Sequence, residues 1–445
     1  MAGASTVEIS QDNVGVFHVP YIPDETIKTA NELLQANHEQ HHVFFNDRGF
    51  HNHITHYVLT QATQMHRVYT QEKSLQRPQH PLDDKVVDRL GDKNYFITCL
   101  SRPENYHNFS RFFEHKIAKD GISPVVHEFL FSRSRIAEEL LSRMFANEYS
   151  PLHMGFLHPV IHFGFGLEFN QPAIIAEGLA QSAVHQPEVG KFFKGIQNAE
   201  KSLENSASRS MIDLIREIEQ NHAIRSASCW GDGSWIDDNP LANAPEGLWK
   251  IAAQWRVSPD ELKLKTAEMI NVCIFHTAAA QRPEKQHKLD FFLIHNVNCS
   301  IFFSALVEKD WMSLEDKARL LEWKGRFDIV AYAVRGSPRL RINEVVNYRP
   351  KKPQMSWGQL FKRVNAFLDD SHVTKLIRAL ANGERVSREY DERADFPMKQ
   401  NMFLKTAHIA LDSTEEALYP DRWLKGAGFE QQWAKFKDRT CDSTV

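Results

Sequence analysis

Apolar side chains recur along most of this chain at steps of three and four residues, the spacing of helices that bury one face. From Asp24 onward, Ile27, Ala30 and Leu34 share such a face. A second stripe, in a helix expected from His53 to about Tyr69, consists of Ile54, Val58, Ala62 and Met65. The same pattern predicts further helices over Tyr106–Ile117, Val125–Tyr149, Pro159 to Pro172, Ala173–His185, Pro259–Ala280, Lys288–Leu306, Leu314–Val334, 356–369 and 371–381.

Strand signals are weak throughout, because no convincing run of alternating apolar and polar residues occurs. Residues 1–23 resemble an irregular lead-in, and residues 70–95 suggest a loop followed by a short helix. The segment 226–246 is rich in Gly, Asp, Asn and Pro, so it is expected to be a loop and the best place for a subdivision. The fold class predicted is all-α, as a single large helical domain over residues 1–445.

Composition narrows the function classes. The chain has 445 residues, with 53 Lys and Arg against 57 Asp and Glu, a net charge of −4. This near-neutral balance argues against nucleic acid as a partner. The sequence contains no apolar run of about 18 residues, which is the length that would predict a membrane span. The N-terminus lacks a secretory pattern and the five cysteines are scattered, so a reducing, cytoplasmic location is expected.

Several common catalytic motifs are absent, namely the P-loop, the G-x-S-x-G elbow and the H-E-x-x-H zinc motif. Gly164 and Gly166 begin like a dinucleotide fingerprint, but the third glycine is missing. They also follow a histidine-rich helical segment instead of a strand, which argues against Rossmann-type binding.

The 22 histidines are the unusual feature of the composition, and two pairs have helical spacing. His53 and His56 are three apart, and His158 and His162 are four apart within an apolar run. Such pairs reach one cavity from one helix face, the arrangement in which a helix supplies two metal ligands. The alternatives are polar residues at a solvent-exposed helix end for the first pair and satisfied core histidines for the second.

Two further segments hold single candidates. His295 follows the apolar run Phe291–Ile294, which favours burial, although a lone histidine is also typical of a core position. Lys375 shares a helix side with Ser371 and Arg378, and the alternative there is a solvated face.

Four strings together resemble the questin oxidase-like family: HNHITHYVLTQA (51–62), LHPVIHFGFGLEFNQPAIIAEGLAQSAVH (157–185), KLDFFLIHNVNCSIFF (288–303) and DDSHVTKLIRAL (369–380). The resemblance spans about residues 50 to 380. It implies an O₂-using enzyme without flavin that opens anthraquinone-type rings of aromatic polyketides in secondary metabolism.

The resemblance also implies a non-haem iron, Fe(II), held by several histidines and by a lysine carboxylated by CO₂. The positions carried over as metal ligands are His56, His158, His162, His295 and Lys375, with His53 competing with His56. Which four histidines bind stays open, and Lys375 and His295 are also expected to act in catalysis. Iron(II) accepts imidazole nitrogens and a hard anionic oxygen, which a carbamate on Lys375 would supply. Burial beside a cation lowers the pKa of a lysine toward the neutral amine that carboxylation requires.

Neighbouring residues are expected to support this site. Glu177, His185 and Asp370 are candidates to orient the ligands, because metal-bound histidines usually donate to a carboxylate or carbonyl. An apolar lining for a flat substrate is expected from Phe163, Phe165, Phe291 and Phe292.

The function expected is therefore oxidative cleavage of a carbon–carbon bond in a quinone-like polyketide ring, with O₂ as co-substrate. One alternative is an NADPH-dependent Baeyer–Villiger monooxygenase on the same substrates, although no nucleotide motif is evident. The others are a non-catalytic helical protein that binds an aromatic metabolite and a metal-dependent hydrolase. The exact substrate, the regiochemistry and the oligomeric state are left open by the sequence.

Overall fold

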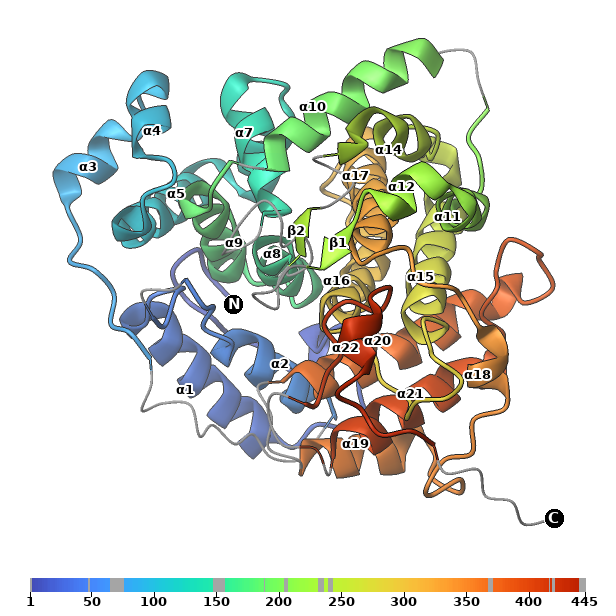
Figure 1. Cartoon of the computed structure of the whole chain (residues 1–445). Helices are drawn as coiled ribbons and strands as arrows, with labels where there is room; N and C mark the ends of the chain where they lie inside the picture. The colour runs from blue at the N-terminus through green and yellow to red at the C-terminus, as the bar shows by residue number, and fades with distance from the viewer. Residues whose placement is uncertain are drawn as a thin grey trace. The chain divides into compact units, whose positions relative to one another are not determined.

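The computed structural model of the chain describes residues 2–46, 49–64, 76–146, 157–187, 189–203, 207–230, 236–238, 243–366, 371–415, 417 and 421–439. Most of these residues lie in helices (Figure 1). Within the described residues the strands are one short antiparallel pair, β1 (Cys229–Trp230) and β2 (Ile236–Asp238). The predicted all-α class is confirmed.

Contacts between Cα atoms divide the chain into two compact units. Unit 1 comprises Met1–Lys194, Phe302–Arg319 and Leu368–Lys375, and unit 2 comprises Gly195–Ile301, Leu320–Phe367 and Leu376–Val445. The helices α10 (Val189–Glu200), α16 (Phe291–Val307), α17 (Leu314–Val334) and α20 (His372–Ser387) have residues in both units. The expectation of one domain over residues 1–445 stays a prediction.

The helices within unit 1 are α1 (Asp24–Gln40), α2 (Ile54–Gln64), α3 (Asp84–Arg89), α4 (Lys93–Cys99), α5 (Tyr106–Asp120), α6 (Ile122–Val126), α7 (Arg135–Met144), α8 (His158–Glu168) and α9 (Pro172–Val184). Those within unit 2 are α11 (Met211–Gln220), α12 (His222–Ser226), α14 (Pro245–Ala252), α15 (Leu262–Ala278), α18 (Ile342–Val346), α19 (Trp357–Asn365), α21 (Gln400–Thr414) and α22 (Glu430–Trp433). Short turns of other helix types are η1 (Gln11–Asn13), η3 (Pro103–Asn105), η4 (His127–Phe131), η5 (Lys201–Leu203), η6 (Pro259–Glu261) and η7 (Arg388–Tyr390).

Helix α9 is the centre of unit 1 and packs against both α8 and α5 (Figure 1). Glycines allow this close packing. A Cβ on Gly178 of α9 would lie 2.8 Å from the backbone of Phe163 in α8, and one on Gly166 would lie 2.7 Å from the amide of Ile175. A Cβ on Gly164 would lie 2.4 Å from the Phe302 ring. Gly164 and Gly166 therefore serve helix packing inside α8.

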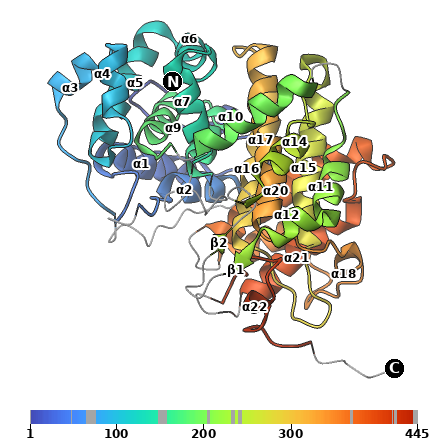
Figure 2. The same cartoon turned by 45° about the horizontal axis from the view of Figure 1, so that its top comes forward.

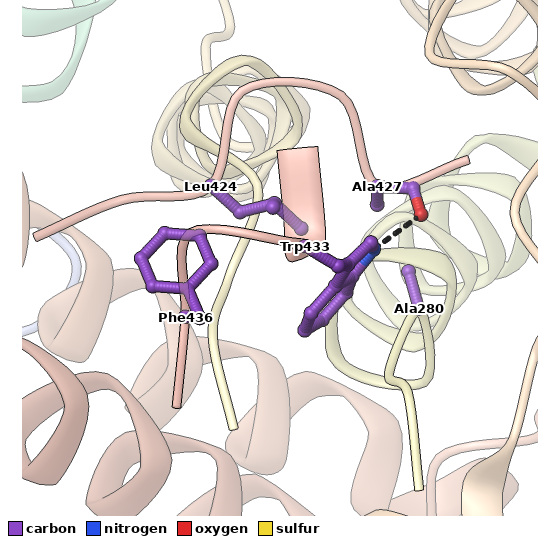
Figure 3. Close-up of a cluster of buried hydrophobic side chains, with 5 residues drawn as sticks. All are labelled: Ala280, Leu424, Ala427, Trp433 and Phe436. Carbon is purple, nitrogen blue, oxygen red and sulfur yellow. Dashed lines mark hydrogen bonds between the residues drawn. The ribbon is translucent and has the colours of Figure 1, made fainter. Parts of the chain in front are cut away.

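Unit 2 is built on long buried helices, with α11, α14 and α15 side by side (Figure 2). The C-terminal segment covers this bundle with a small apolar cluster of Ala280, Leu424, Ala427, Trp433 and Phe436 (Figure 3). The indole Nε1 of Trp433 donates to the carbonyl of Ala427 at 2.9 Å. Leu424 also exchanges backbone hydrogen bonds with Leu289 and Phe291, which fixes the segment at the start of α16.

One predicted helix is wrong. The expected helix over Val125–Tyr149 is interrupted, because α6 ends at Val126 and α7 starts only at Arg135. Between them lie the wider turn η4 and Arg133, whose φ of 61° is left-handed and incompatible with a continuing helix. Ser134 then caps α7 by accepting from the amide of Ala137. Residues 147–149 lie outside the described part.

Other expectations are refined. α17 has the predicted bounds, while α16 starts at Phe291 because the Asp290 carboxylate accepts the amides of Phe292 and Leu293. Part of the expected loop 226–246 forms β1 and β2, and the whole loop lies inside one segment of unit 2, because the chain first passes from unit 1 to unit 2 after Lys194. The helices α10, α11 and α21 were not expected. No helix of the described residues has the length and apolar character needed to cross a bilayer.

Candidate active site

The turn before α2 fixes two histidines at the start of the helix. The side chain of Asn52 accepts the amide of Ile54 at 2.9 Å and so caps α2. The same side chain donates to Asn37 of α1 at 2.7 Å. The helix is thereby anchored with His53 just before its first residue and His56 in its first turn. Their ring centres are 5.6 Å apart, so both reach the same region of unit 1.

Helix α8 supplies the second pair, as the spacing of four predicts. His158 and His162 are 5 % and 4 % exposed. His158 Nε2 lies 2.9 Å from His53 Nε2, and His162 Nδ1 lies 3.3 Å from His56 Nε2. The predicted burial and shared face of this pair are confirmed. The structure thus brings four candidate histidines from two helices into direct ring-to-ring contact.

Helix α9 contributes a carboxylate through its close approach to α8. Because Gly178 lies on the backbone of Phe163, its neighbour Glu177 reaches His162, and the Glu177 Oε2 to His162 Nε2 distance is 2.5 Å. The other carboxylate oxygen, Oε1, lies 2.6 Å from His38 Nδ1. Burial alone would raise the pKa of Glu177, but the hydrogen bonds from His162 and His38 outweigh it and lower it to about 2. Glu177 is therefore ionised and accepts a hydrogen bond from each ring.

This hydrogen bond determines the tautomer of His162. With Nε2 donating to Glu177, Nδ1 carries the lone pair that faces His56. Burial and the positive charge of Lys375 lower the pKa of His56 well below its usual value. Neutral rings whose nitrogens carry lone pairs are the form in which imidazole binds a metal.

Further histidines surround these four. His51 stacks on His158 with ring centres 4.3 Å apart, and His372 of α20 meets the edge of His53 at 5.3 Å. His185 donates from Nδ1 to the carbonyl of Gln181 at 2.6 Å, so its Nε2 accepts from His51 Nε2 at 3.0 Å. Thus His185 contacts His51 and supports the cluster from one side. We call these seven residues the histidine cluster: His51, His53, His56, His158, His162, His185 and His372.

Two other predicted residues of unit 1 lie beside the cluster. Lys375 is 5 % exposed in α20, and its charge acts on His56. Phe165 stacks on the ring of His56 at 5.0 Å and meets Phe302 edge-on at 4.7 Å. Phe163 packs instead in the interface of α8 with α9. Asp370, also expected here, lies outside the described residues.

The remaining predicted residues belong to unit 2. His295 is fully buried in α16 and donates from Nδ1 to the carbonyl of Phe291 at 2.6 Å, which leaves the lone pair on Nε2. Phe291 meets the His295 ring edge-on at 4.9 Å. Phe292 is buried in the same helix. Their participation in the site stays a prediction.

Sequence reasoning missed several members of this site. His51 and His372 lie in strings that carry the family resemblance, so their position beside His53 and Lys375 was the available signal. His38 joins through Glu177, and its Nε2 lies 3.4 Å from Glu114 of α5. Nothing in the sequence around His38 distinguishes it from a surface helix residue, because its contacts come only from tertiary packing.

The donor set is suited to a metal in its chemistry and in its pairwise distances. An imidazole nitrogen lies about 2.1 Å from a bound divalent metal, so two such ligands at a right angle are about 3 Å apart. The contacts His53–His158 and His56–His162, at 2.9 and 3.3 Å, have this separation. In the described part of the chain, however, no three His, Cys, Asp or Glu side chains converge on one point as a complete ligand group.

Comparison with known proteins gives the class of protein to which this buried cluster belongs. The questin oxidase-like family matches residues 50–380. The chain belongs to the questin oxidase-like family and is an oxidoreductase, which confirms both predictions.

Curated relatives match over nearly the whole chain. The questin oxidase of Aspergillus terreus (strain NIH 2624 / FGSC A1156) is 38% identical over 97% of this chain and 98% of its own length. The Baeyer–Villiger monooxygenase dmxR6 of Cryptosporiopsis sp. (strain 8999) is 37% identical over 97% of this chain and 98% of its own. The Baeyer–Villiger oxidase ptaJ of Pestalotiopsis fici (strain W106-1 / CGMCC3.15140) is 37% identical over the same shares.

Proposed function

We propose that this protein is a non-haem iron-dependent oxygenase that cleaves a carbon–carbon bond in the ring of an anthraquinone-type aromatic polyketide. The observation that carries the proposal is the two pairs of facing imidazoles, His53 with His158 and His56 with His162, whose nitrogens have the separation of two ligands on one metal. The names of the relatives, questin oxidase and Baeyer–Villiger oxidase, support the oxygenase class and the quinone-type substrate.

The residues that would hold iron in unit 1 are His56, His158 and His162, with His53 as the alternative to His56. A carboxylated Lys375 would add a hard anionic oxygen, and its burial beside these rings supports that assignment. The role of His295 rests on the family resemblance. When bound, the iron would supply the activation of O₂ that the reaction needs.

The chain's own residues would prepare this chemistry. Glu177 keeps the proton of His162 on Nε2, so that Nδ1 would be the nitrogen available to a metal. The stacked Phe165 excludes water from one face of His56. His51 and His185, hydrogen-bonded to each other, hold the ring of His158 in place by stacking.

The test is oxygen uptake on a hydroxyanthraquinone by the iron-loaded protein, with ¹⁸O₂ and with or without NADPH. We expect uptake without NADPH and two labelled oxygen atoms in the ring-opened product. The second candidate, an NADPH-dependent Baeyer–Villiger monooxygenase, is favoured by the name of the relative dmxR6. It predicts strict NADPH dependence and one labelled atom, because two electrons reduce the other atom to water.

A further inference from the structure

Helix α17 and Arg335, the residue directly after it, provide three buried cations that are each at most 1 % exposed, and two of them have carboxylate partners. Lys324 Nζ lies 2.6 Å from Asp328 Oδ1. The guanidinium of Arg326 contacts Glu200 at 2.7 Å and Glu322 at 2.9 Å, and its Nε donates to the carbonyl of Trp255 at 3.1 Å. These two are satisfied structural cations of unit 2.

Arg335, at the end of the same helix, differs from both. Neither its Nε nor its Nη2 has a hydrogen-bond partner among the residues that the structure describes. Its Cζ lies 4.0 Å over the ring of Phe292, so one face of the guanidinium is covered by an aromatic ring. Two charged donors without an acceptor at this depth are costly and rare in a native protein.

Asp290, whose negative charge acts on Arg335, is already engaged in other hydrogen bonds. Its Oδ1 accepts the amides of Phe292 and Leu293, and its Oδ2 accepts those of Gly426 and Ala427, each at 2.7 Å. Asp290 therefore acts on Arg335 only through its charge, and that charge does not cancel the effect of burial, which lowers the pKa of Arg335 to about 10. Arg335 stays charged at neutral pH.

Two more buried polar side chains without partners lie near by. Asn296 is one helical turn beyond Phe292 on α16, and neither atom of its amide has a partner among the described residues. His276 of α15 is 5.8 Å from the ring of Tyr332, which precedes Arg335 by three residues on α17. Neither ring nitrogen of His276 has a hydrogen-bond partner among the described residues. Three helices of unit 2 thus bring unmatched polar groups to adjoining faces.

We propose that Arg335 is a binding residue for a pair of coplanar oxygens, at least one of them ionised, on an aromatic small molecule. Nε and Nη2 are the two parallel donors on one edge of the guanidinium, which match such a pair in two hydrogen bonds. Phe292 adds an aromatic surface, and the amide of Asn296 lies one turn beyond it on α16. The identity of the molecule rests on the proposed function: an ionised phenol beside a quinone carbonyl presents this oxygen pair, as does an aromatic carboxylate.

The experiment measures equilibrium binding by calorimetry without oxygen, so that it depends on neither turnover nor iron. The ligands are a 1-hydroxyanthraquinone at a pH where the phenol is ionised, its 1-methyl ether, and a hydroxybenzoate. The proteins are the unmodified chain, Arg335→Gln, Arg335→Lys, and the control Arg339→Gln at an exposed arginine of the same unit.

We expect Arg335→Gln to weaken the binding of the ionised quinone about 10- to 100-fold and the binding of the methyl ether less than about 3-fold. Arg335→Lys keeps the charge but loses the paired donors, so its affinity for the ionised quinone should lie between those of the unmodified chain and Arg335→Gln. The affinity of Arg339→Gln should match that of the unmodified chain. The same loss with hydroxybenzoate would assign the oxygen pair to a carboxylate.

Equal losses for the ionised quinone and its ether, or no loss with either ionised ligand, would overturn the proposal and make Arg335 a cation satisfied by internal water. Thermal unfolding of each variant is measured in parallel. If Arg335→Gln does not fold, the comparison rests on Arg335→Lys. Arg335-dependent binding without oxygen uptake would refute the proposed function while leaving this inference standing.

Discussion

Each unit of the molecule buries polar side chains, but the two do so differently. In unit 2, Lys324 and Asp328 form an ion pair with both side chains fully buried, and the charge of Asp328 raises the pKa of Lys324 above its usual value although burial opposes it. In unit 1, the histidine cluster places like groups against like, with ring nitrogens 2.9 to 3.3 Å apart. The first arrangement is complete within the protein. The second needs shared protons or a bound cation, which is why we place the chemistry in unit 1.

The largest effect should come from removing a ring of the cluster. We expect His162→Ala to lower turnover by more than about 100-fold, beyond the effect of losing a residue that only orients a ligand. The measurement is oxygen uptake on a hydroxyanthraquinone with added iron, alongside a thermal melt. Near-normal turnover in a folded variant would mean that the cluster is structural, like the ion pair of unit 2.

The ion pair should respond in stability instead of activity. Lys324→Met leaves the carboxyl group of Asp328 buried without its partner, so we expect a loss of about 3–5 kcal/mol in the free energy of unfolding. Replacing both residues by apolar ones of similar size should restore most of that loss. Denaturant titration of the single and double variants measures both. If the single and the double variant lost the same free energy of unfolding, Lys324 and Asp328 would not be a structural pair that is complete within the protein.

Acid should weaken the fold through buried neutral imidazoles. His42 of unit 1 is fully buried, and burial lowers its pKa to about 4 from 6.5. The unfolded chain then binds a proton between pH 6.5 and 4 that the folded chain does not, so stability is full above pH 6.5 and falls as pH decreases. From pH 7 to pH 5 this one group should remove about 2 kcal/mol. Comparing urea titrations at both pH values with His42→Gln tests this, because the variant should show a smaller difference.

A subtler change separates orientation from ligation within the cluster. Glu177→Gln keeps the shape but removes the charge that holds the proton on His162 Nε2. Metal affinity should fall about 10- to 100-fold, as for other residues that orient ligands. Titration with iron under anaerobic conditions measures this. The control is Glu384→Gln, a carboxylate of unit 2 that accepts from Trp357, and it should not change the affinity.

The smallest expected effect concerns the helix contact that delivers Glu177. In Gly178→Ala the new methyl would lie 2.8 Å from the Phe163 backbone, so we expect a loss of about 1–3 kcal/mol. Gly358→Ala in α19 meets nothing within 4 Å and should stabilise by up to about 1 kcal/mol. Unfolding midpoints of the two variants measure the contrast. Equal midpoints would mean that α8 and α9 can separate without cost.

The residues show where prediction from sequence succeeds. Periodicity located Leu314–Val334 with the observed bounds, and the spacing of four placed His158 and His162 on one buried face, because both properties are local to one helix. Periodicity failed at Arg133, where a single residue with left-handed backbone geometry divides an apolar run that was predicted to be one helix. The link from His38 through Glu177 to His162 joins α1, α9 and α8, and no local pattern encodes such a contact.

The most direct test of the central claim is elemental analysis of the full chain purified without added metal. We predict close to one iron per chain, lost in the double variant His158→Ala, His162→Ala. The control His287→Gln, which changes a histidine of unit 2 outside the cluster, should keep the metal. The absence of metal from the unmodified chain after anaerobic reconstitution with iron(II), or full iron retention by the double variant, would contradict the account.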